Sequence, residues 1–276
     1  MRVVAVLLAM AMLTGCGSAS VTGSPVDRIA EAKAALPQAV RDAAAITAGT
    51  DPTFEPMTFM DNGRFAGLDV DIGNAIGATL GLSVRWESVP FGQLLDQVST
   101  HKIDISMSSM FDRATRQQKA DFVDYLNAGT SIVVRAGTGD IGGMAGLCGR
   151  RVAVQADTVY VDMAEAQRQQ CGGRGLTIVL SDKPSEAVQQ NRADAGLNDY
   201  PIATLDVAKL PGLEISGPQI EALPYGIGIA KDRESLTKAI QTALYRLIED
   251  GTYDALLAKW KVTEGALRTG ALNGGV

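Results

Sequence analysis

Two serines and an arginine form the first group of residues with the potential to bind a ligand. Ser108 and Ser109 follow an apolar segment that is typical of a buried strand, and Arg116 opens a polar segment that is typical of a helix. Free backbone N–H groups at a helix start favour an anion, and a guanidinium holds a carboxylate through two parallel hydrogen bonds. These residues indicate a receptor for a small carboxylate or phosphate. The alternative is a solvated arginine that caps a surface turn.

A second group of candidate residues lies elsewhere in the chain. Asp199 ends a short apolar strand, where it could accept an ammonium group. Thr158 stands at a helix start, where its hydroxyl could serve as a helix cap or as a ligand donor. Phe54 and Phe91 lie in loops after strands. Ligands of open α/β sheets bind beyond the carboxyl ends of the strands, and all these residues fall there. A positive group and a negative group on opposite sides would clasp a zwitterion.

The elements that must position these residues alternate between strand and helix. The first unit has predicted strands at 46–51, 83–90, 103–109 and 130–137, and a hairpin that turns at Asn62–Gly63. Its predicted helices lie at 71–80 and 91–100. We expect Asp71 to cap the first of these helices and Gly81 to end it. The second unit has predicted strands at 151–155, 176–180 and 195–197, and helices at 159–170 and 185–192. A strand at 225–230 and helices at 234–251 and 253–260 follow. This alternation indicates an α/β fold with a largely parallel sheet.

Composition excludes several classes of partner. The 276-residue chain has a formal charge of −6 and no run rich in lysine and arginine, which argues against nucleic acid. It has one histidine, His101, and no Cys/His cluster, so we expect no transition-metal site. The glycines at 225–230 match no dinucleotide fingerprint, and we expect no cofactor.

The N-terminus indicates export. Arg2 is followed by an apolar run at 3–13, which is shorter than the roughly 20 residues needed to span a bilayer and is typical of a signal peptide. The sequence "LTGC" then resembles the lipobox of bacterial lipoproteins, where cleavage precedes a cysteine that becomes acylated, with palmitate among the acyl chains. We expect a signal peptide at 1–15, lipidation at Cys16, and a tether with an N-terminal helix at 16–45. An ordinary signal peptide with an incidental cysteine is the alternative.

The remaining cysteines are Cys148 and Cys171. Outside the cytosol, an even pair suggests a disulfide. Two buried free thiols are the alternative.

Seven segments in order carry a resemblance to a known family. They are "LPQAVRDAAAITAGTDPTFEPMTF", "GRFAGLDVDIGNAIGATLGLSVRW", "HKIDISMSSMFDRATRQQKADFVDYLNAGTSIVV", "LCGRRVAVQADT", "RADAGLNDYPIA", "PYGIGIAKD" and "LIEDGTYDALLAKW". From about Leu36 to Trp260 the chain resembles the extracellular solute-binding proteins of family 3, which deliver polar amino acids to ABC importers. The "LCG" segment suggests a subgroup that carries the Cys148–Cys171 bridge.

The resemblance implies a Venus flytrap of the periplasmic-binding-protein type II kind, in which two α/β lobes are joined by two crossing strands. The crossings would lie near 134–137 and 219–224. Lobe 1 would comprise 46–134 and 224–264, lobe 2 would comprise 135–223, and 265–276 would form a tail.

The resemblance also assigns roles to the candidate residues. Arg116 would bind the α-carboxylate of the ligand and Asp199 its α-ammonium. Ser108, Ser109 and Thr158 would add donors. Phe54 and Phe91 would wall the side-chain pocket, with Asp51 near its floor.

Some residues depart from the family pattern. Phe111 and Arg113 replace residues that are usually small or carry a hydroxyl, and Asp157 and Val159 replace a glycine and a threonine. These departures bear on the ligand more than on the fold. A cationic side chain is one candidate, because Asp51, Glu55, Asp112 and Asp157 could attract it; the alternative is that they face solvent.

The expected function is therefore binding without catalysis, by a monomer anchored through Cys16 at the outer face of the cytoplasmic membrane and working with a membrane permease. One alternative is an enzyme on the same scaffold, such as a dehydratase using Glu55 and Asp199 as an acid/base pair. Another is a ligand sensor without transport.

Overall fold

Residues 25–276 are described by a computed structural model, so the predicted signal peptide and Cys16 lie outside the described residues. The helices are α1 (Pro25–Ala35), α2 (Gln38–Ala43), α3 (Leu68–Leu80), α4 (Leu94–Ser99), α5 (Ala114–Gln117), α6 (Val159–Gln170), α7 (Pro184–Gln189), α8 (Tyr200–Lys209), α9 (Glu234–Glu249) and α10 (Thr252–Trp260). The strands are β1 (Ala45–Thr50), β2 (Thr53–Phe54), β3 (Thr58–Asp61), β4 (Arg64–Ala66), β5 (Ser83–Ser88), β6 (Ile105–Ser106), β7 (Ala120–Arg135), β8 (Arg151–Val154), β9 (Thr177–Leu180), β10 (Ala195–Asp199) and β11 (Leu213–Ala230).

One continuous sheet runs through the molecule in the order β5-β1-β6-β11-β7-β10-β8-β9. Its outer strands pair in parallel, as the alternation of strands and helices predicts. The two long central strands, β7 and β11, pair antiparallel with each other and with their neighbours. The sheet is therefore mixed, and the prediction of a largely parallel sheet holds only outside its centre.

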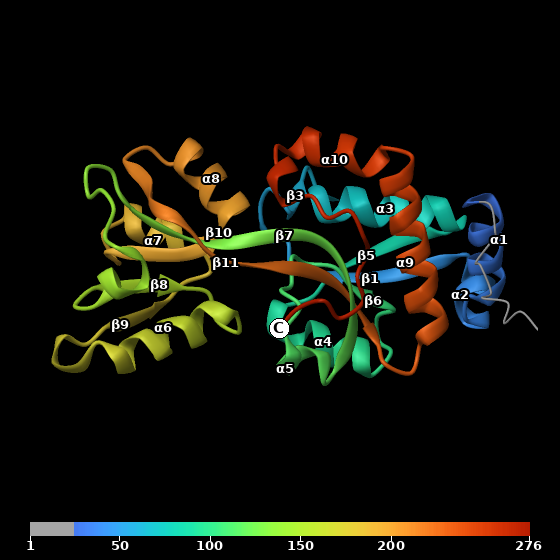
Figure 1. The fold of residues 1–276 in the computed structure, drawn as a ribbon, viewed down its shortest axis with the longest axis horizontal. Coiled ribbons are helices and arrows are strands. Elements are labelled where there is room, and N and C mark those ends of the chain that lie inside the picture. The colour runs from blue at the N-terminus through green and yellow to red at the C-terminus, as the bar shows by residue number, and fades with distance from the viewer. Residues whose placement is uncertain (1–24) are drawn as a thin grey trace, which may run out of the picture.

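The elements form two lobes on either side of the middle of β7 and β11 (Figure 1). Lobe 1 holds α1–α5, β1–β6, α9 and α10, and lobe 2 holds α6–α8 and β8–β10. Residues 130–134 of β7 pair with β10 of lobe 2, next to the predicted first crossing at 134–137. The register between β7 and β11 shifts between Ser216 and Leu223, where the second crossing was expected.

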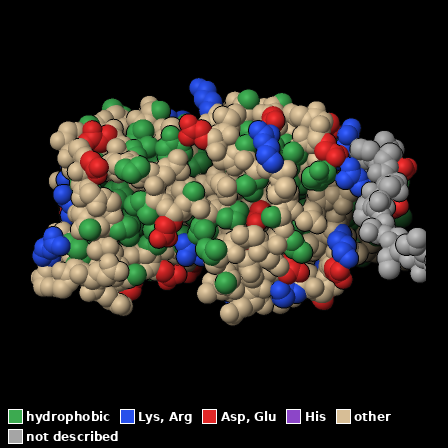
Figure 2. Space-filling model, viewed as in Figure 1, with side chains coloured by type: hydrophobic (Ala, Val, Ile, Leu, Met, Phe, Trp, Pro, Cys, Tyr) green, Lys and Arg blue, Asp and Glu red, His purple; other side chains and the backbone are tan. Residues whose placement is uncertain are grey.

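Apolar burial holds each lobe together. Ile46, Leu68 and Ile229 are fully buried in lobe 1, and Val152 and Leu197 are fully buried in lobe 2. Figure 2 shows apolar side chains gathered on the lobe at the left, with charged side chains scattered over both lobes. Within residues 25–276, no helix combines the length and apolarity that a membrane span requires.

Local sequence signals explain several boundaries and fail at others. Asn62 and Gly63 both adopt positive φ in the β3–β4 turn, and Gly81 ends α3 in the left-handed conformation, as predicted. Helix α3 begins at Leu68, three residues earlier than predicted. Asp71 is not its cap, because the N-cap residue is Gly67 and Asp71 lies inside the first turn. The Asp71 carboxylate accepts hydrogen bonds from Lys259 and Trp260 of α10.

Further elements differ from expectation, among them β6, which is only two residues long, and β7, which begins at Ala120 and not at 130. Helix α5 is a single turn of four residues, so Arg116 lies inside it and does not open a longer helix. Helix α8, which directly follows Asp199, was not predicted. A disulfide joins Cys148 to Cys171 in lobe 2, with their Cα atoms 5.3 Å apart.

Candidate functional site

Arg116 lies at the edge of lobe 1, where its guanidinium contacts one backbone carbonyl and one aromatic ring. Its Nη1 donates a hydrogen bond to the carbonyl of Phe111 at 2.9 Å, and its Cζ lies 5.4 Å from the ring centroid of Phe91. Burial, together with the charge of Arg113, lowers the pKa of Arg116 to about 10, so the group stays cationic at neutral pH. Within the described chain Arg116 forms no ion pair shorter than 4.0 Å, which leaves the guanidinium available to an anion.

Asp199 supplies the opposite charge from lobe 2. It ends β10, is 2% exposed, and accepts a hydrogen bond from the hydroxyl of Tyr160. Burial raises the pKa of Asp199 to about 7, while the hydroxyl of Tyr225 and the charge of Arg116 lower it. Across the boundary between the lobes, the charge of Asp199 raises the pKa of Arg116 and the charge of Arg116 lowers the pKa of Asp199.

Two phenylalanines form an apolar wall beside these charges. The rings of Phe54 and Phe91 are stacked, with centroids 6.2 Å apart and an interplanar angle of 12°. Both side chains are buried. Because the Arg116 guanidinium lies over the Phe91 ring, the sequence-predicted wall and the predicted anion receptor belong to one site.

The two serine hydroxyls contact lobe 1 itself. Ser108 Oγ accepts a hydrogen bond from the backbone N–H of Asp51 at 3.0 Å. Ser109 adopts a positive φ of 50°, and its hydroxyl donates to Asp69 Oδ2 at 3.0 Å. These hydroxyls bond within lobe 1 and shape the loop beside Arg116. Their role as donors to a ligand stays a prediction.

Asp69 is a buried carboxylate that sequence reasoning missed. It lies in the first turn of α3 and also accepts hydrogen bonds from Tyr125 at 2.7 Å and Thr58 at 3.2 Å. Burial raises the pKa of Asp69 to about 6, although these three hydroxyl donors lower it. The signal was present in the sequence "GLDVDI", where an acid stands at a helix start between apolar residues.

Thr158 and Asp51 have structural partners. The Thr158 hydroxyl accepts from Tyr160 N–H at 3.3 Å and donates to the Gln155 carbonyl at 2.8 Å, which confirms the cap interpretation. Asp51 accepts from the Phe91 N–H at 3.0 Å and from Thr53, so it fixes the loop that carries the phenylalanine. Both residues border the site.

The acids considered for a cationic ligand have different neighbours. Glu55 pairs with Lys209 of lobe 2, with Oε1 and Nζ 2.5 Å apart. Asp112 is buried against Gly275 near the C-terminus. The Asp157 carboxylate packs against Gly92 of lobe 1. Of the departures from the family pattern, Phe111 packs on Tyr225, with ring centroids 4.9 Å apart.

A groove of about 400 Å³ between the lobes adjoins this site. Phe54 and Glu55 line it from lobe 1, and Asn198 lines it from lobe 2, next to Asp199. Its acidic lining residues are Glu55, Asp182, Glu186 and Asp206, and its basic ones are Lys183 and Lys209. Residues 25–276 contain no group of three or more His, Cys, Asp or Glu side chains that could hold a metal ion.

Comparison with known proteins agrees with the fold. The model of the bacterial extracellular solute-binding proteins, family 3, matches residues 46–263. The chain belongs to this family. Its periplasmic-binding-protein type II fold is confirmed by the solved structure of an ancestral arginine-binding protein bound to arginine, with a TM-score of 0.74, 30% identity, and coverage of 79% of this chain and 98% of that one.

Curated members of the family are similar over most of this chain. The arginine-binding protein ArgT of Corynebacterium glutamicum is 29% identical, covering 90% of this chain and 84% of its own length. The lysine/arginine/ornithine-binding periplasmic protein of Escherichia coli is also 29% identical, covering 92% and 95%.

Proposed function

We propose that this family 3 protein captures a basic amino acid, such as L-arginine, between its lobes and delivers it to the permease of an ABC importer. The observation that carries the proposal is the opposition of Arg116 in lobe 1 and Asp199 in lobe 2, with the stacked Phe54 and Phe91 rings beside them. The named ligands of the similar arginine- and lysine-binding proteins support the same class of ligand.

Each part of an amino acid has a matching group. The guanidinium of Arg116 would hold the α-carboxylate through a bidentate pair. Asp199 would accept the α-ammonium in place of the Tyr160 hydroxyl. A cationic side chain would lie along the phenylalanine wall toward the acidic lining of the groove, because a cation is attracted to an aromatic face and to carboxylates.

Closure of the lobes would follow from contacts that one lobe alone cannot make. A ligand that touches both Arg116 and Asp199 binds the closed form more tightly than the open form, and this difference shifts the population toward closure. Glu55 and Lys209 add a direct ion pair between the lobes. The permease would then recognise the closed shape.

We further propose that the protein is exported and anchored as a monomer through a lipid on Cys16, with the lobes divided as the resemblance implies. Export is supported by similarity to the periplasmic proteins of the family. Whether the bound ligand is transported or only sensed is tested by deleting the protein and measuring uptake of radiolabelled L-arginine. Unchanged uptake would favour a sensor.

Binding without catalysis is the proposal for this site. A precursor of cyclohexadienyl dehydratase is among the similar structures, at 28% identity, but that structure is itself of an amino-acid-binding protein. The two residues of the candidate acid/base pair also have different hydrogen-bond partners: Glu55 accepts from Lys209, and Asp199 accepts from Tyr160.

A thermal-shift screen of the chain from residue 17 against all common amino acids tests the proposal. A ligand at a thousand times its dissociation constant stabilises the folded state by about 4 kcal/mol. We expect L-arginine or another basic amino acid to raise the melting temperature most. If the basic amino acids leave it unchanged, this ligand class is wrong; turnover of a candidate substrate would favour an enzyme instead.

A further inference from the structure

The last residues of the chain form an ordered strap along lobe 1. We use "C-terminal strap" for residues 265–276. Ala266 bridges to Leu126 of β7, and Leu272 bridges to Val123. Asn273 and Phe122 exchange two hydrogen bonds, at 2.8 and 2.9 Å. The strap therefore follows β7 from the middle of the molecule toward the start of that strand.

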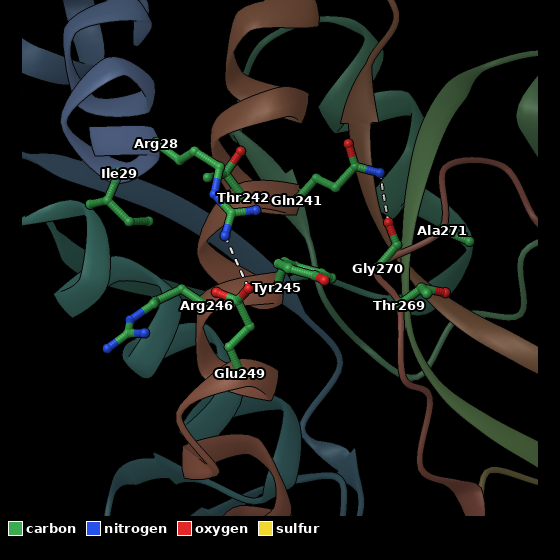
Figure 3. A pocket seen from close by; sticks show the side chains of 10 residues that line it. All are labelled: Arg28, Ile29, Gln241, Thr242, Tyr245, Arg246, Glu249, Thr269, Gly270 and Ala271. Atoms are coloured by element: carbon green, nitrogen blue, oxygen red, sulfur yellow. Dashed lines mark hydrogen bonds and ion pairs between the residues drawn. The ribbon is translucent and has the colours of Figure 1, made fainter. Parts of the chain in front are cut away.

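Helix α9 holds the middle of the strap. Gln241 Nε2 donates to the carbonyl of Gly270 at 2.6 Å, and Figure 3 shows this bond at one side of a cavity of about 380 Å³. On the other side of the cavity, Arg28 of α1 forms an ion pair with Glu249 of α9. The strap is thus fixed to the body of lobe 1 before it reaches the site.

The end of the strap contacts the segment that carries Arg116. The Gly275 N–H donates to Asp112 Oδ2 at 2.8 Å, and Gln117 Nε2 donates to Asp112 Oδ1 at 2.9 Å. The Ala114 N–H donates to the backbone oxygen of Val276 at 3.1 Å. Helix α5 has no side-chain cap, so the strap supplies the acceptor for an N–H group of its first turn.

These contacts are next to the backbone that orients the guanidinium. Arg116 donates to the carbonyl of Phe111, and Asp112 is the following residue. The Asp112 N–H in turn donates to the carbonyl of Pro224 at 2.8 Å. Residues 111–117 are therefore held from one side by β11 and from the other by the strap.

The end of the strap packs so closely that only small residues fit there, and its N–H groups donate hydrogen bonds to buried carboxylates. A Cβ on Gly275 would overlap the backbone oxygen of Asp112, and a Cβ on Gly274 would meet Asp124 Oδ2. The Gly274 N–H donates to that same oxygen at 3.1 Å. Asp112 and Asp124 are both buried, and burial together with the Asp112 charge raises the pKa of Asp124 to about 7. Without the strap, both carboxylates would lose a donor.

We propose that the C-terminal strap is a positioning element for the carboxylate receptor: Gly275 and Asp112 hold residues 111–117 so that Arg116 is oriented before the ligand arrives. The proposal rests on the proposed binding of an amino acid. Ordering a binding group in advance removes an entropic cost of association, so loss of the strap should weaken binding of the ligand carboxylate in particular.

Two variants of the chain from residue 17 test this positioning role. One stops after Leu272, and the other carries Gly275→Ala, which keeps the chain length if the shortened form folds poorly. The control is Arg268→Ala, which removes an ion pair with Asp254 at the start of the strap and leaves its end intact.

Hydrogen exchange of the ligand-free proteins is the first measurement. We expect faster exchange of amides in 111–119 for both test variants, unchanged exchange in 159–170 of lobe 2, and no change in the control. Equal exchange of 111–119 in the parent and both test variants would overturn the proposal, whether or not any amino acid binds.

Calorimetric titration with L-arginine and L-argininamide is the second measurement, because the amide lacks the carboxylate charge. We expect each test variant to lose about fivefold or more in affinity for arginine and less than about twofold for the amide. An equal loss for both ligands would show general destabilisation and overturn the positioning role. A parent protein that binds neither ligand would overturn the proposed function, while hydrogen exchange still decides whether the strap orders residues 111–117.

Discussion

The carboxylate of Asp51 accepts a hydrogen bond from the backbone N–H of Phe91 at 3.0 Å. These two residues come from loops 40 positions apart, and this bond joins the loop after β1 to the loop after β5. Asp51 also accepts two hydrogen bonds from Thr53, which leads into β2 and Phe54. One carboxylate thus fixes both halves of the phenylalanine wall.

Asp51→Ala should therefore weaken ligand binding because Phe54 and Phe91 are held less firmly, and the loss should not depend on the charge of the ligand side chain. Loss of a charge-assisted hydrogen bond costs about 1.5 kcal/mol, which is roughly tenfold in affinity. We expect similar losses for L-arginine and for its uncharged isostere L-citrulline, measured by calorimetry. If Asp51 instead contacted the ligand guanidinium, arginine would lose much more affinity than citrulline.

Arg116→Ala should abolish detectable binding while the protein stays folded. Removing one partner of a charge-assisted, partly buried pair costs about 3 kcal/mol or more, or over a hundredfold in affinity. Arg116→Lys should recover only part of the loss, because an ammonium cannot form the bidentate pair. Circular dichroism monitors the fold, and Arg150→Ala, far from the site in lobe 2, is the control. Unchanged affinity in Arg116→Ala would refute the carboxylate assignment.

The pKa of Asp199 predicts a pH dependence of binding. At about 7, this pKa means that the free protein is mostly protonated at Asp199 below pH 6. The ligand ammonium binds the ionised form, so binding lowers the pKa and releases a proton. Affinity for L-arginine should therefore rise with pH, by up to about tenfold per unit below pH 7, and level off above it.

Calorimetry in two buffers of different ionisation enthalpy measures this proton release directly. We expect close to one proton released at pH 6 and much less at pH 8. Asp69 and Asp124 also have raised pKa values, but their hydrogen-bond partners belong to lobe 1, and Asp69 adds only a charge effect at Asp199. A dissociation constant and an enthalpy that do not vary between these conditions would contradict the assignment of Asp199 to the ammonium.

The backbone positions of the candidate site followed well from the sequence. Arg116 and Phe91 follow β6 and β5, while Asp199 ends β10 and Phe54 ends β2, just after β1. Such strand ends are recognisable from apolar runs that stop at polar residues. The family resemblance supplied their order. What the pattern could not supply is the direction in which a hydroxyl points. Ser109 turns toward Asp69, and this depends on a contact between residues 40 positions apart.

The missed elements have physical explanations as well. Strand β11 extends back to Leu213, but Gly217 and Pro218 interrupt the apolar alternation that would have indicated it. The short tail at 265–276 has no periodic pattern, so only its fit between β7 and α9 shows that it is ordered. Both cases reflect tertiary contacts that override weak local signals.

The ion pair between Glu55 and Lys209 yields the last prediction, because it joins the two lobes. Both side chains are about half exposed, and such a pair contributes about 0–1 kcal/mol. In this position the contribution acts on closure, since the bond is lost when the lobes separate. Lys209→Gln should therefore weaken L-arginine binding by up to about fivefold at low salt, and the difference should shrink at 1 M salt, where charges are screened beyond about 3 Å.

A matched control separates closure from a general effect of lost charge. Lys183→Gln breaks a similarly exposed ion pair with Glu186. Lys183 directly precedes α7 and Glu186 lies in α7, so both residues belong to lobe 2 and this pair does not join the lobes. Small-angle scattering of the ligand-free variants should show a larger radius of gyration for Lys209→Gln alone. If both variants change affinity equally, the loss of one lysine charge near the groove explains the effect, and the ion pair between the lobes has no special role in closure. If neither changes, ligand contacts rather than this ion pair determine closure, and Arg116 with Asp199 must supply the difference in free energy between the open and closed forms.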